Sequence, residues 1–390
     1  MKNLQDKELY NKLVLLRVDY NVKLKGTEKV GDVDRIYNTL ETIKRLVSAG
    51  ARVVICSHLG RPKGQIVEEL SLKKVYKLFN EQCTHLVGAK NVIFSEFAIG
   101  DSVDNLKRNL KPKEILFLEN LRFYEGEENC DMQFAKQLCN EMDIFIDEAF
   151  AVSHRKCASN VCCASILPTY YGLNTYKEWE NLTLDDKEKP ICVILGGAKV
   201  NDKLDLLLNL LDKIDCLCIG GLSSLAFLKL HGIECASEVE KDAEKSAREI
   251  LTKANALGVK VLLPLDFTCV ECEKLESGYR EISLFTQQLT CEQISSKHLC
   301  YDIGDKTIDA FVEQIEKSAT VFWNGPLGYI EDDRFQKGTK LVAEKLAKSK
   351  VFSIIGGGDT AQMIRKLPFA DKINFISTGG GASLNYLQKN

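Results

Sequence analysis

Short apolar, β-branched runs alternate with longer amphipathic stretches along the whole chain. In the N-terminal half, helical patterns such as 36–50 and 134–142 separate candidate strands at 13–19, 51–58, 91–97, 114–120 and 144–150. In the C-terminal half, strand-like apolar runs together with the glycine-rich turns that follow them span 191–197, 216–221, 351–360 and 374–381, and further candidate strands lie at 259–267 and 320–325. This alternation predicts mostly parallel, doubly wound sheets, and a length of 390 residues favours two α/β domains over one.

A polar segment separates the two halves. Gly172 breaks the pattern before it, the next dozen residues are polar and compatible with a helix, and Pro190 ends them. We therefore predict a first domain at 1–171, a linker helix at 172–189, a second domain at 190–377 and a C-terminal segment at 378–390.

Charge and hydropathy argue against several classes of function. The net charge of -3 provides no global basic field for nucleic acid. The apolar runs are shorter than a membrane span, and the polar start MKNLQDKELYNK has no signal-peptide core. We expect a cytoplasmic protein without a nucleic-acid or membrane partner.

Several of the fifteen cysteines lie inside strand-like runs, among them Cys56, Cys192 and Cys218. This placement predicts buried, reduced thiols in a cytosolic protein. Cys269 and Cys272 form a lone C-x-x-C pair, and a zinc site would need a second ligand pair that is not evident.

Four apolar runs of the C-terminal half end in glycine-rich turns. Glycine lets backbone N–H groups approach phosphate oxygens where a strand leads into a helix. The turn GGGDT at 356–360 opens a helical pattern and fits a relaxed dinucleotide fingerprint, but the next strand ends in Ser377 and Thr378 instead of an acid for the ribose. No G-x-x-x-x-G-K-[ST] motif is present. Four such turns favour a polyphosphate site over tight turns alone.

Two further segments of this half could contact a nucleotide. Lys199 and Lys203 lie four residues apart, so at a helix start they share a face that could hold an anion; a solvated helix face is the alternative. The loop WNGPLG at 323–328 follows a strand, and Glu331 beyond it could accept hydrogen bonds from ribose hydroxyls; a plain turn is the alternative.

Eight of the twelve arginines lie in the first 155 residues. Polar segments follow four candidate strands there, at 17–21, 57–62, 119–123 and 154–155. The carboxyl ends of parallel strands meet at one edge, and the guanidinium fork fits carboxylates and phosphates. These segments predict a site for a small, highly charged anion, although each arginine alone could be a surface ion pair. We interpret His58 and His154 as hydrogen-bond donors in this site in preference to general bases.

The motifs RVDYN, SHLGRPKG, LENLRF, GGAKVNDK, WNGPLG, GGGDT and STGGGAS occur in that order. With them the chain resembles the phosphoglycerate kinase family over essentially its whole length. The resemblance implies an α/β fold of two Rossmann-like, doubly wound parallel-sheet domains joined by a hinge helix, the first for 3-phosphoglycerate and the second for the nucleotide, with 378–390 returning towards the hinge. It also implies a monomeric glycolytic kinase that transfers a phosphoryl group reversibly between 1,3-bisphosphoglycerate and MgADP, giving 3-phosphoglycerate and MgATP.

The resemblance also assigns residues to each ligand. Those implied for 3-phosphoglycerate are Asp19, Asn21, Arg35, His58, Arg61, Arg122 and Arg155. Those implied for ATP or ADP are Gly197, Lys199, Lys203, Gly221, Leu327, Glu331, Gly356, Gly357, Gly358, Asp359 and Thr360, with Asp359 on Mg²⁺. The implied catalytic set is Arg35, Lys199, Gly357 and Gly380. The acceptor carboxylate is already ionised at neutral pH, so this chemistry needs positioning and charge stabilisation but no general base.

The chain departs from the family pattern at three places. Leu222-Ser223-Ser224 stands where relatives have smaller residues and a methionine, beside the expected adenine pocket. Ala151-Val152-Ser153 replaces a usual glycine-threonine-alanine, and many relatives continue beyond the residues STGGGASLNYLQKN. Two other functions remain open: a Rossmann-type dehydrogenase, which the missing ribose acid disfavours, and a non-catalytic nucleotide-binding scaffold, which the presence of Arg35, Lys199 and Asp359 disfavours.

Overall fold

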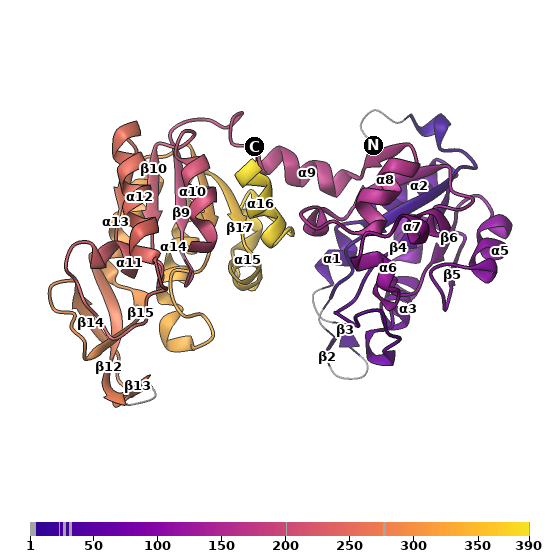
Figure 1. The fold of residues 1–390 in the computed structure, drawn as a ribbon. Helices are drawn as coiled ribbons and strands as arrows, with labels where there is room; N and C mark the ends of the chain where they lie inside the picture. Colours follow the sequence, from indigo (N-terminus) through magenta and orange to yellow (C-terminus); the bar gives the residue numbers. More distant parts are fainter. Residues whose placement is uncertain are drawn as a thin grey trace. The chain divides into compact units, whose positions relative to one another are not determined.

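The computed structural model describes residues 5–22, 24–25, 29–30, 33–199, 201–275 and 278–389. The chain forms two compact units, an N-terminal unit (Met1–Glu180) and a C-terminal unit (Asn181–Asn390) (Figure 1). Helix α9 (Leu173–Leu182) occupies part of the segment expected to link the halves and contains the boundary.

The N-terminal unit is built on a parallel sheet of six strands in the order β5-β6-β4-β1-β7-β8. The strands are β1 (Leu13–Val18), β4 (Arg52–Cys56), β5 (Asn91–Phe94), β6 (Glu114–Phe117), β7 (Ile144–Glu148) and β8 (Thr169–Tyr171). Every residue of β1 and β7 is buried, as is typical of parallel strands covered by helices on both faces. A separate two-stranded antiparallel pair joins β2 (Leu24–Lys25) to β3 (Lys29–Val30).

Two apolar cores lie on opposite faces of this sheet, because successive strand residues point to opposite sides. One core contains Val14 and Leu16 and is completed by helices α1 (Asp34–Tyr37), α2 (Leu40–Ser48), α3 (Lys73–Gln82) and α4 (Thr84–Val87). The other contains Leu13 and Leu15 and is completed by α5 (Asp101–Asn109), α7 (Met132–Leu138) and α8 (Cys163–Ile166). The prediction of a doubly wound parallel sheet is therefore confirmed.

The single helix expected at 36–50 is wrong, because α1 and α2 are separate helices. The Thr39 hydroxyl between them donates to the carbonyl of Ile36 (2.8 Å) and contacts the Tyr20 hydroxyl (2.7 Å). Threonine can bond a nearby backbone carbonyl in this way, in competition with the regular helical pattern.

Helix α9 begins at a carboxylate of the N-terminal unit. The Glu148 side chain accepts from the backbone N–H groups of Asn174 and Thr175, both at 3.1 Å, and so satisfies two donors of the first helical turn. Gly172 precedes the helix, and a Cβ there would lie 2.0 Å from Glu148 Oε2. The close approach explains why glycine stands at this position.

The C-terminal unit has a second parallel sheet of six strands in the order β11-β10-β9-β16-β17-β18. Counted along the chain within this sheet, the order is 3-2-1-4-5-6, the order of the Rossmann fold. The strands are β9 (Ile191–Leu195), β10 (Cys216–Ile219), β11 (Lys260–Leu262), β16 (Thr320–Asn324), β17 (Phe352–Gly356) and β18 (Phe375–Ile376). The helices are α10 (Leu204–Leu210), α11 (Ser224–Lys229), α12 (Ala243–Leu257), α13 (Asp305–Glu316), α14 (Lys337–Lys348), α15 (Gly358–Arg365) and α16 (Gly381–Lys389).

The strand predicted at 259–267 divides into two strands of different sheets. Pro264, which has no N–H to donate to a sheet, separates β11 from β12 (Asp266–Leu275). β12 pairs antiparallel with β13 (Gly278–Glu281), β14 (Gln287–Thr290) and β15 (His298–Ile303). This four-stranded sheet was not predicted from the sequence.

The C-terminal helix lies within the C-terminal unit. α16 packs against α10, and the Asn209 amide donates to the carbonyl of Gln388 (2.7 Å). The Tyr386 and Thr183 hydroxyls are 3.0 Å apart, so the helix contacts the residues that directly follow α9. Among the described residues, no helix combines the length and apolar character needed to cross a membrane.

Candidate active site

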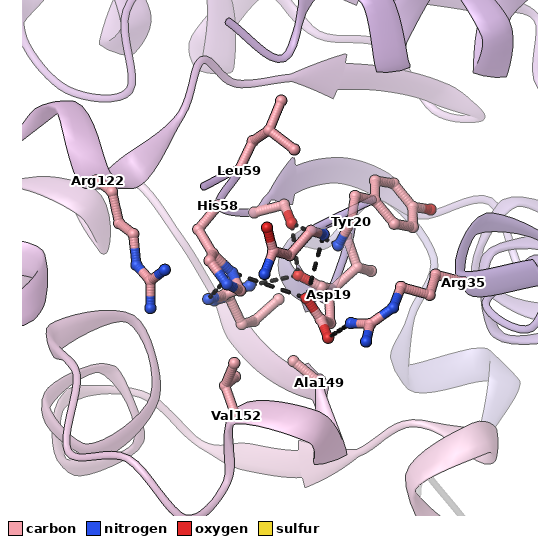
Figure 2. Close-up of polar contacts among 12 residues, drawn as sticks. Asp19, Tyr20, Arg35, His58, Leu59, Arg122, Ala149 and Val152 are labelled. Atoms are coloured by element: carbon pink, nitrogen blue, oxygen red, sulfur yellow. Dashed lines mark hydrogen bonds and ion pairs between the residues drawn. The ribbon is translucent and has the colours of Figure 1, made fainter. Parts of the chain in front are cut away.

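The polar segments of the N-terminal unit follow β6, β4, β1 and β7, four strands that are neighbours in the sheet. Figure 2 shows side chains from these segments turned toward one another, with the guanidinium groups of Arg122 and Arg35 on opposite sides of Asp19 and His58. The strand order therefore assembles residues that lie more than 100 positions apart in sequence.

Asp19 joins two of these segments. One of its carboxylate oxygens accepts from the Arg35 guanidinium at the start of α1, and the other accepts from the backbone N–H of Asn21 (3.2 Å). The Asn21 side-chain oxygen accepts from the N–H of Gly60, beyond β4 (2.9 Å). The predicted residues Asp19, Asn21 and Arg35 thus form one connected set.

Arg17 lies beneath this set and is 1% exposed. Its guanidinium donates to Ser159 Oγ (2.8 Å), to the carbonyl of Val18 and to His58 Nδ1 (3.1 Å). Glu127, also 1% exposed, lies 3.8 Å from the same guanidinium and accepts both from Ser159 Oγ (2.6 Å) and from Ser159 N–H (2.9 Å).

This arrangement assigns the tautomer of His58. Arg17 can only donate, so Nδ1 of His58 must accept and the ring proton lies on Nε2. Burial, followed by the charges of Arg17, Arg122, Arg155 and Arg35, lowers the pKa of His58 well below its usual value. The ring is therefore neutral, its 3.8 Å approach to Asp19 is not an ion pair, and it can donate one hydrogen bond.

Arg122 is held from two sides. Its guanidinium donates to the carbonyl of Gly60 (2.7 Å) and pairs with Glu128 (3.3 Å). The fully buried Asn120 accepts from the N–H groups of Leu59 (3.2 Å) and Arg122 (3.0 Å), which fixes the two loops against each other. A side chain positioned in this way loses little freedom when it binds an anion.

The other two predicted arginines are more exposed. Arg61 has an exposed side chain in the loop that follows β4. Arg155 is half-buried, and its Nε donates to Nε2 of His154 (3.3 Å). The atypical 151–153 segment overlaps a short 3₁₀ helix, Phe150–Val152, in which Val152 is buried.

Sequence reasoning missed the residues beneath the site. The motifs contain Arg17 and Asn120 without giving either a separate role, and no local pattern points to Glu127 or Ser159. Glu127 is one of three glutamates in the four-residue helix α6 (Glu125–Glu128), a composition typical of a solvated surface. Only the tertiary contact with Ser159 distinguishes Glu127 from its neighbours.

In the C-terminal unit, turns after three neighbouring strands interlock. Gly196 donates its N–H to the carbonyl of Asn324 (2.9 Å), and Gly197 donates to that of Pro326 (2.7 Å). Gly197 and Gly221 have φ of +89° and +61°, and a Cβ on Gly221 would lie 2.7 Å from the nitrogen of Gly197. Glycine is thus required here for backbone approach, at the point where the strand order reverses between β9 and β16.

Two buried polar atoms near the GGGDT turn after β17 have no hydrogen-bond partner among the described residues. They are Nδ2 of Asn324 and Oγ1 of Thr360, in residues that are 2% and 1% exposed. Asn324 Nδ2 is 3.0 Å from the Cβ positions built on Gly356 and Gly357, so it lies directly beside the GGGDT turn. Buried polar groups are normally paired, so these atoms point to a polar ligand at the start of α15.

The two lysines that follow the Gly196-Gly197 turn do not share a helical face, and that prediction is wrong. Helix α10 begins only at Leu204, after a 3₁₀ turn at Asn201–Lys203, and Val200 lies outside the described residues. The Lys203 ammonium donates to the carbonyl of Gly196, whereas the Lys199 side chain is exposed.

The remaining predicted nucleotide residues occupy different environments. Leu327 is fully buried, and a Cβ on Gly220 would lie 2.6 Å from its side chain. Glu331 is exposed. Gly358 and Asp359 are exposed in the first turn of α15. Gly380 has φ of +54° and follows β18, the strand beside β17.

The unusual Leu222-Ser223-Ser224 segment satisfies its own polar groups. The Ser223 and Ser224 hydroxyls donate to the carbonyls of Gly220 (3.0 Å) and Gly221 (2.6 Å). Leu222 packs against a small core that includes Leu225, Phe267 and Ile294. The substitution therefore keeps the turn ordered without leaving buried hydroxyls unpaired.

The residues at the start of α15 fit a magnesium ion that arrives with a nucleotide. Mg²⁺ is usually bound through one or two carboxylates together with substrate phosphates, and Asp359 supplies an exposed carboxylate beside the unpaired Thr360 hydroxyl. Among the described residues, the one cluster of three potential metal ligands is Cys192, Cys216 and Cys218, all buried. The described residues therefore contain no metal site built from carboxylates of the protein alone.

Two doubly wound units, one with arginines at its strand ends and the other with glycine-lined turns, define the class as a kinase with two α/β domains. The family model described as phosphoglycerate kinase matches residues 4–390. The chain belongs to the phosphoglycerate kinase family.

Individual relatives agree over nearly the whole chain. The phosphoglycerate kinase of Finegoldia magna is 41% identical over 392 residues, covering 99% of this chain and 96% of the relative. That of Pseudothermotoga lettingae is 39% identical over 388 residues, covering 99% and 95%. The solved structure of phosphoglycerate kinase from Coxiella burnetii is 32% identical with a TM-score of 0.84, covering 100% of this chain and 96% of that one. The structure from Pyrococcus horikoshii is 28% identical with a TM-score of 0.79, covering 98% and 94%.

Proposed function

We propose that the chain catalyses reversible phosphoryl transfer between 1,3-bisphosphoglycerate and MgADP, giving 3-phosphoglycerate and MgATP, as a cytoplasmic glycolytic monomer. Membership of the phosphoglycerate kinase family supports the reaction. The single structural observation that carries it is the cluster of Asp19, Arg35, His58 and Arg122 at one sheet edge.

The N-terminal cluster suits 3-phosphoglycerate, a small anion with a carboxylate, a hydroxyl and a phosphate. Arg122, Arg61 and Arg155 supply guanidinium forks for its charged groups. His58 adds a neutral N–H donor, and Asp19 and Asn21 can accept from a hydroxyl. Asp19 also holds Arg35, which we assign to the transferring phosphoryl group.

The glycine turns of the C-terminal unit suit a nucleotide. Gly197, Gly221 and Gly356–Gly358 let the backbone approach phosphates, and Lys199 and Lys203 add positive charge. Leu327 and Glu331 serve the nucleoside, Asp359 holds Mg²⁺, and Thr360 with Asn324 faces the phosphates. Bound Mg²⁺ neutralises phosphate charge during transfer. Because Gly357 and Gly380 have no side chains, they leave room for the transferred phosphoryl group.

The two ligand sets belong to separate units, so transfer requires the units to close on each other. Closure would also exclude water, which can hydrolyse an acyl phosphate. Each ligand would favour the closed state through contacts made only there. We assign the hinge to Gly172, α9 and the segment near Thr378.

A coupled assay with 3-phosphoglycerate and MgATP tests the proposal. Arg35→Ala should lower kcat about 10³-fold or more with a smaller effect on KM, because Arg35 is assigned to charge that develops during transfer. Arg108→Ala is the matched control, since Arg108 is an exposed arginine of the same unit paired with Glu141 (3.3 Å), and it should keep wild-type kcat. MgADP binding without turnover would support the scaffold alternative, and retention of kcat by the Arg35 variant would refute its assignment.

A further inference from the structure

Two cysteines of the N-terminal unit lie in direct contact. The sulfur atoms of Cys130 and Cys162, 32 positions apart in sequence, are 3.2 Å from each other. Cys130 lies in the turn between α6 and α7, and Cys162 is the last residue of a helical segment at Ala158–Cys162. The Cys162 thiol also donates to the backbone carbonyl of Cys130, at 3.2 Å.

Neighbouring contacts hold these two segments together independently of the sulfurs. Glu127, three residues before Cys130, accepts from both the N–H and the hydroxyl of Ser159, three residues before Cys162. The segments are therefore fixed by hydrogen bonds on the core side, and the sulfurs face each other beyond them. A disulfide requires sulfurs about 2.05 Å apart, so they need to approach by about 1.2 Å.

Access distinguishes this pair from two other sulfur contacts, which lie wholly in apolar cores. Half-buried Cys235, hydrogen-bonded to buried Cys300, is a further accessible thiol. Cys130 is half-buried, and Cys162 is 5% exposed. The pairs Cys192–Cys218 (3.7 Å) and Cys269–Cys300 (3.5 Å) consist of fully buried residues. A dissolved oxidant can therefore reach Cys130 without unfolding the unit, whereas those two pairs are enclosed in apolar cores.

We propose that Cys130 and Cys162 are a site of reversible oxidation, closing to a disulfide when the protein meets a peroxide. The Cys130 thiolate attacks hydrogen peroxide, the O–O bond breaks and hydroxide leaves, giving a sulfenic acid. The Cys162 sulfur then attacks the sulfenic sulfur, the S–O bond breaks, and the proton of Cys162 leaves with the oxygen as water. Peroxide gains the two electrons that the two thiols lose, and a dithiol reverses the change.

The disulfide would tie the α6–α7 turn to the segment that carries Ser159. It closes a long loop and restricts the unfolded chain, so the oxidised protein should unfold at higher urea concentration. The pair of Glu128 and Arg122 (3.3 Å) involves neither cysteine, so the KM for 3-phosphoglycerate should change less than about twofold. The proposed oxidation of Cys130 and Cys162 thus does not depend on the proposed kinase reaction.

The experiment treats the full chain with hydrogen peroxide and then alkylates free thiols under denaturing conditions. We expect the oxidised chain to take up two fewer alkyl groups than the reduced chain, and to give a cross-linked peptide joining Cys130 to Cys162 that dithiothreitol reverses. Cys130→Ser and Cys162→Ser should each abolish the cross-link and the rise in urea midpoint. The matched control is Cys291→Ser, which removes a half-buried cysteine whose thiol donates to the carbonyl of Pro264 (3.2 Å) and should leave both unchanged.

Cys235 serves as an internal indicator that the oxidant has acted. It is half-buried, and its hydrogen bond with Cys300 lowers its pKa to about 7. If Cys235 is oxidised while Cys130 and Cys162 both remain open to alkylation, the proposal is wrong. A cross-link from either residue to a different cysteine would also overturn it.

Discussion

The buried pair of Arg17 and Glu127 should couple the stability of the N-terminal unit to the geometry of its anion site. Both side chains are 1% exposed and lie 3.8 Å apart. Removal of Arg17 would leave Glu127 as a buried charge whose one side-chain partner among the described residues is Ser159. Breaking a buried pair from one side is costly, because the remaining charge has lost both water and partner.

The distance between the Arg17 and Glu127 charges sets the size of the expected loss of stability. Two unit charges 3.8 Å apart interact by about 4 kcal/mol at an effective dielectric constant of about 20. Arg17→Met should therefore lower the free energy of unfolding by about 3–5 kcal/mol. Glu127→Gln should cost less, because Asp19 and Asp147 also interact favourably with the Arg17 charge. The double variant leaves no buried charge without its partner. Its free energy of unfolding should therefore fall by at least about 2 kcal/mol less than the sum of the decreases in the two single variants.

Tryptophan fluorescence isolates the relevant unit. The chain has two tryptophans: Trp323 is in β16 of the C-terminal unit, and Trp179 is in α9, where its ring centroid lies 4.2 Å from that of Tyr171. In a Trp323→Phe background, urea unfolding followed at Trp179 reports the N-terminal unit. Losses that simply add, with a coupling below about 0.5 kcal/mol, would refute the pairing.

The remaining predictions concern ligands, closure and pH. Arg61→Ala and Arg122→Ala should weaken 3-phosphoglycerate binding and leave MgADP binding nearly unchanged, and Asp359→Ala should do the reverse; equal losses of both ligands in calorimetry would contradict separate sites. Small-angle scattering should give a smaller radius of gyration with both substrates than with either alone, and an unchanged profile at saturation would refute closure. Burial raises the pKa of Glu148 and of Asp302 to about 7, so between about pH 4 and 7 these two carboxyls hold more protons in the folded chain than in the unfolded one. The lowered pKa of His58 acts in the opposite direction, but it is one group against two. Stability should therefore decline as pH rises from about 4 to 7, and a higher urea midpoint at pH 7.5 than at pH 5 would contradict this.

Much of the architecture could be predicted because local signals and global fold agree. Apolar runs such as 13–16 and 191–195 lie in parallel strands whose residues are all buried. The antiparallel sheet β12–β15 was missed because its strands mix exposed charges with short apolar segments. The division of 36–50 depends on Thr39, whose bond to Tyr20 exists only after β1 and α1 meet.

The site was predictable at the level of residue types and strand ends, but its electrostatics were not. Motifs identified Asp19, Arg35 and His58, whereas the protonation of His58 depends on Arg17 beneath it and on how deeply the ring is buried. In the C-terminal unit, the sequence indicated glycines for phosphates but could not reveal the unpaired atoms of Asn324 and Thr360. Burial is a property of the packed chain, so no local pattern reports it.

The neutral state of His58 bears on how the anion site achieves selectivity. A protonated imidazole among Arg17, Arg35 and Arg122 would repel them, and desolvation would add to that cost. Keeping the ring neutral lets the site place one directional N–H donor among several fixed cations, so that a hydroxyl or carboxylate oxygen is recognised by geometry as well as by charge. Arg17 is therefore expected to act as a positioning residue, because it adds positive charge next to His58 and holds Nδ1 of the ring as an acceptor. In the proposed site, arginines and a neutral imidazole would hold the anion, which suits a transfer that needs no proton acceptor.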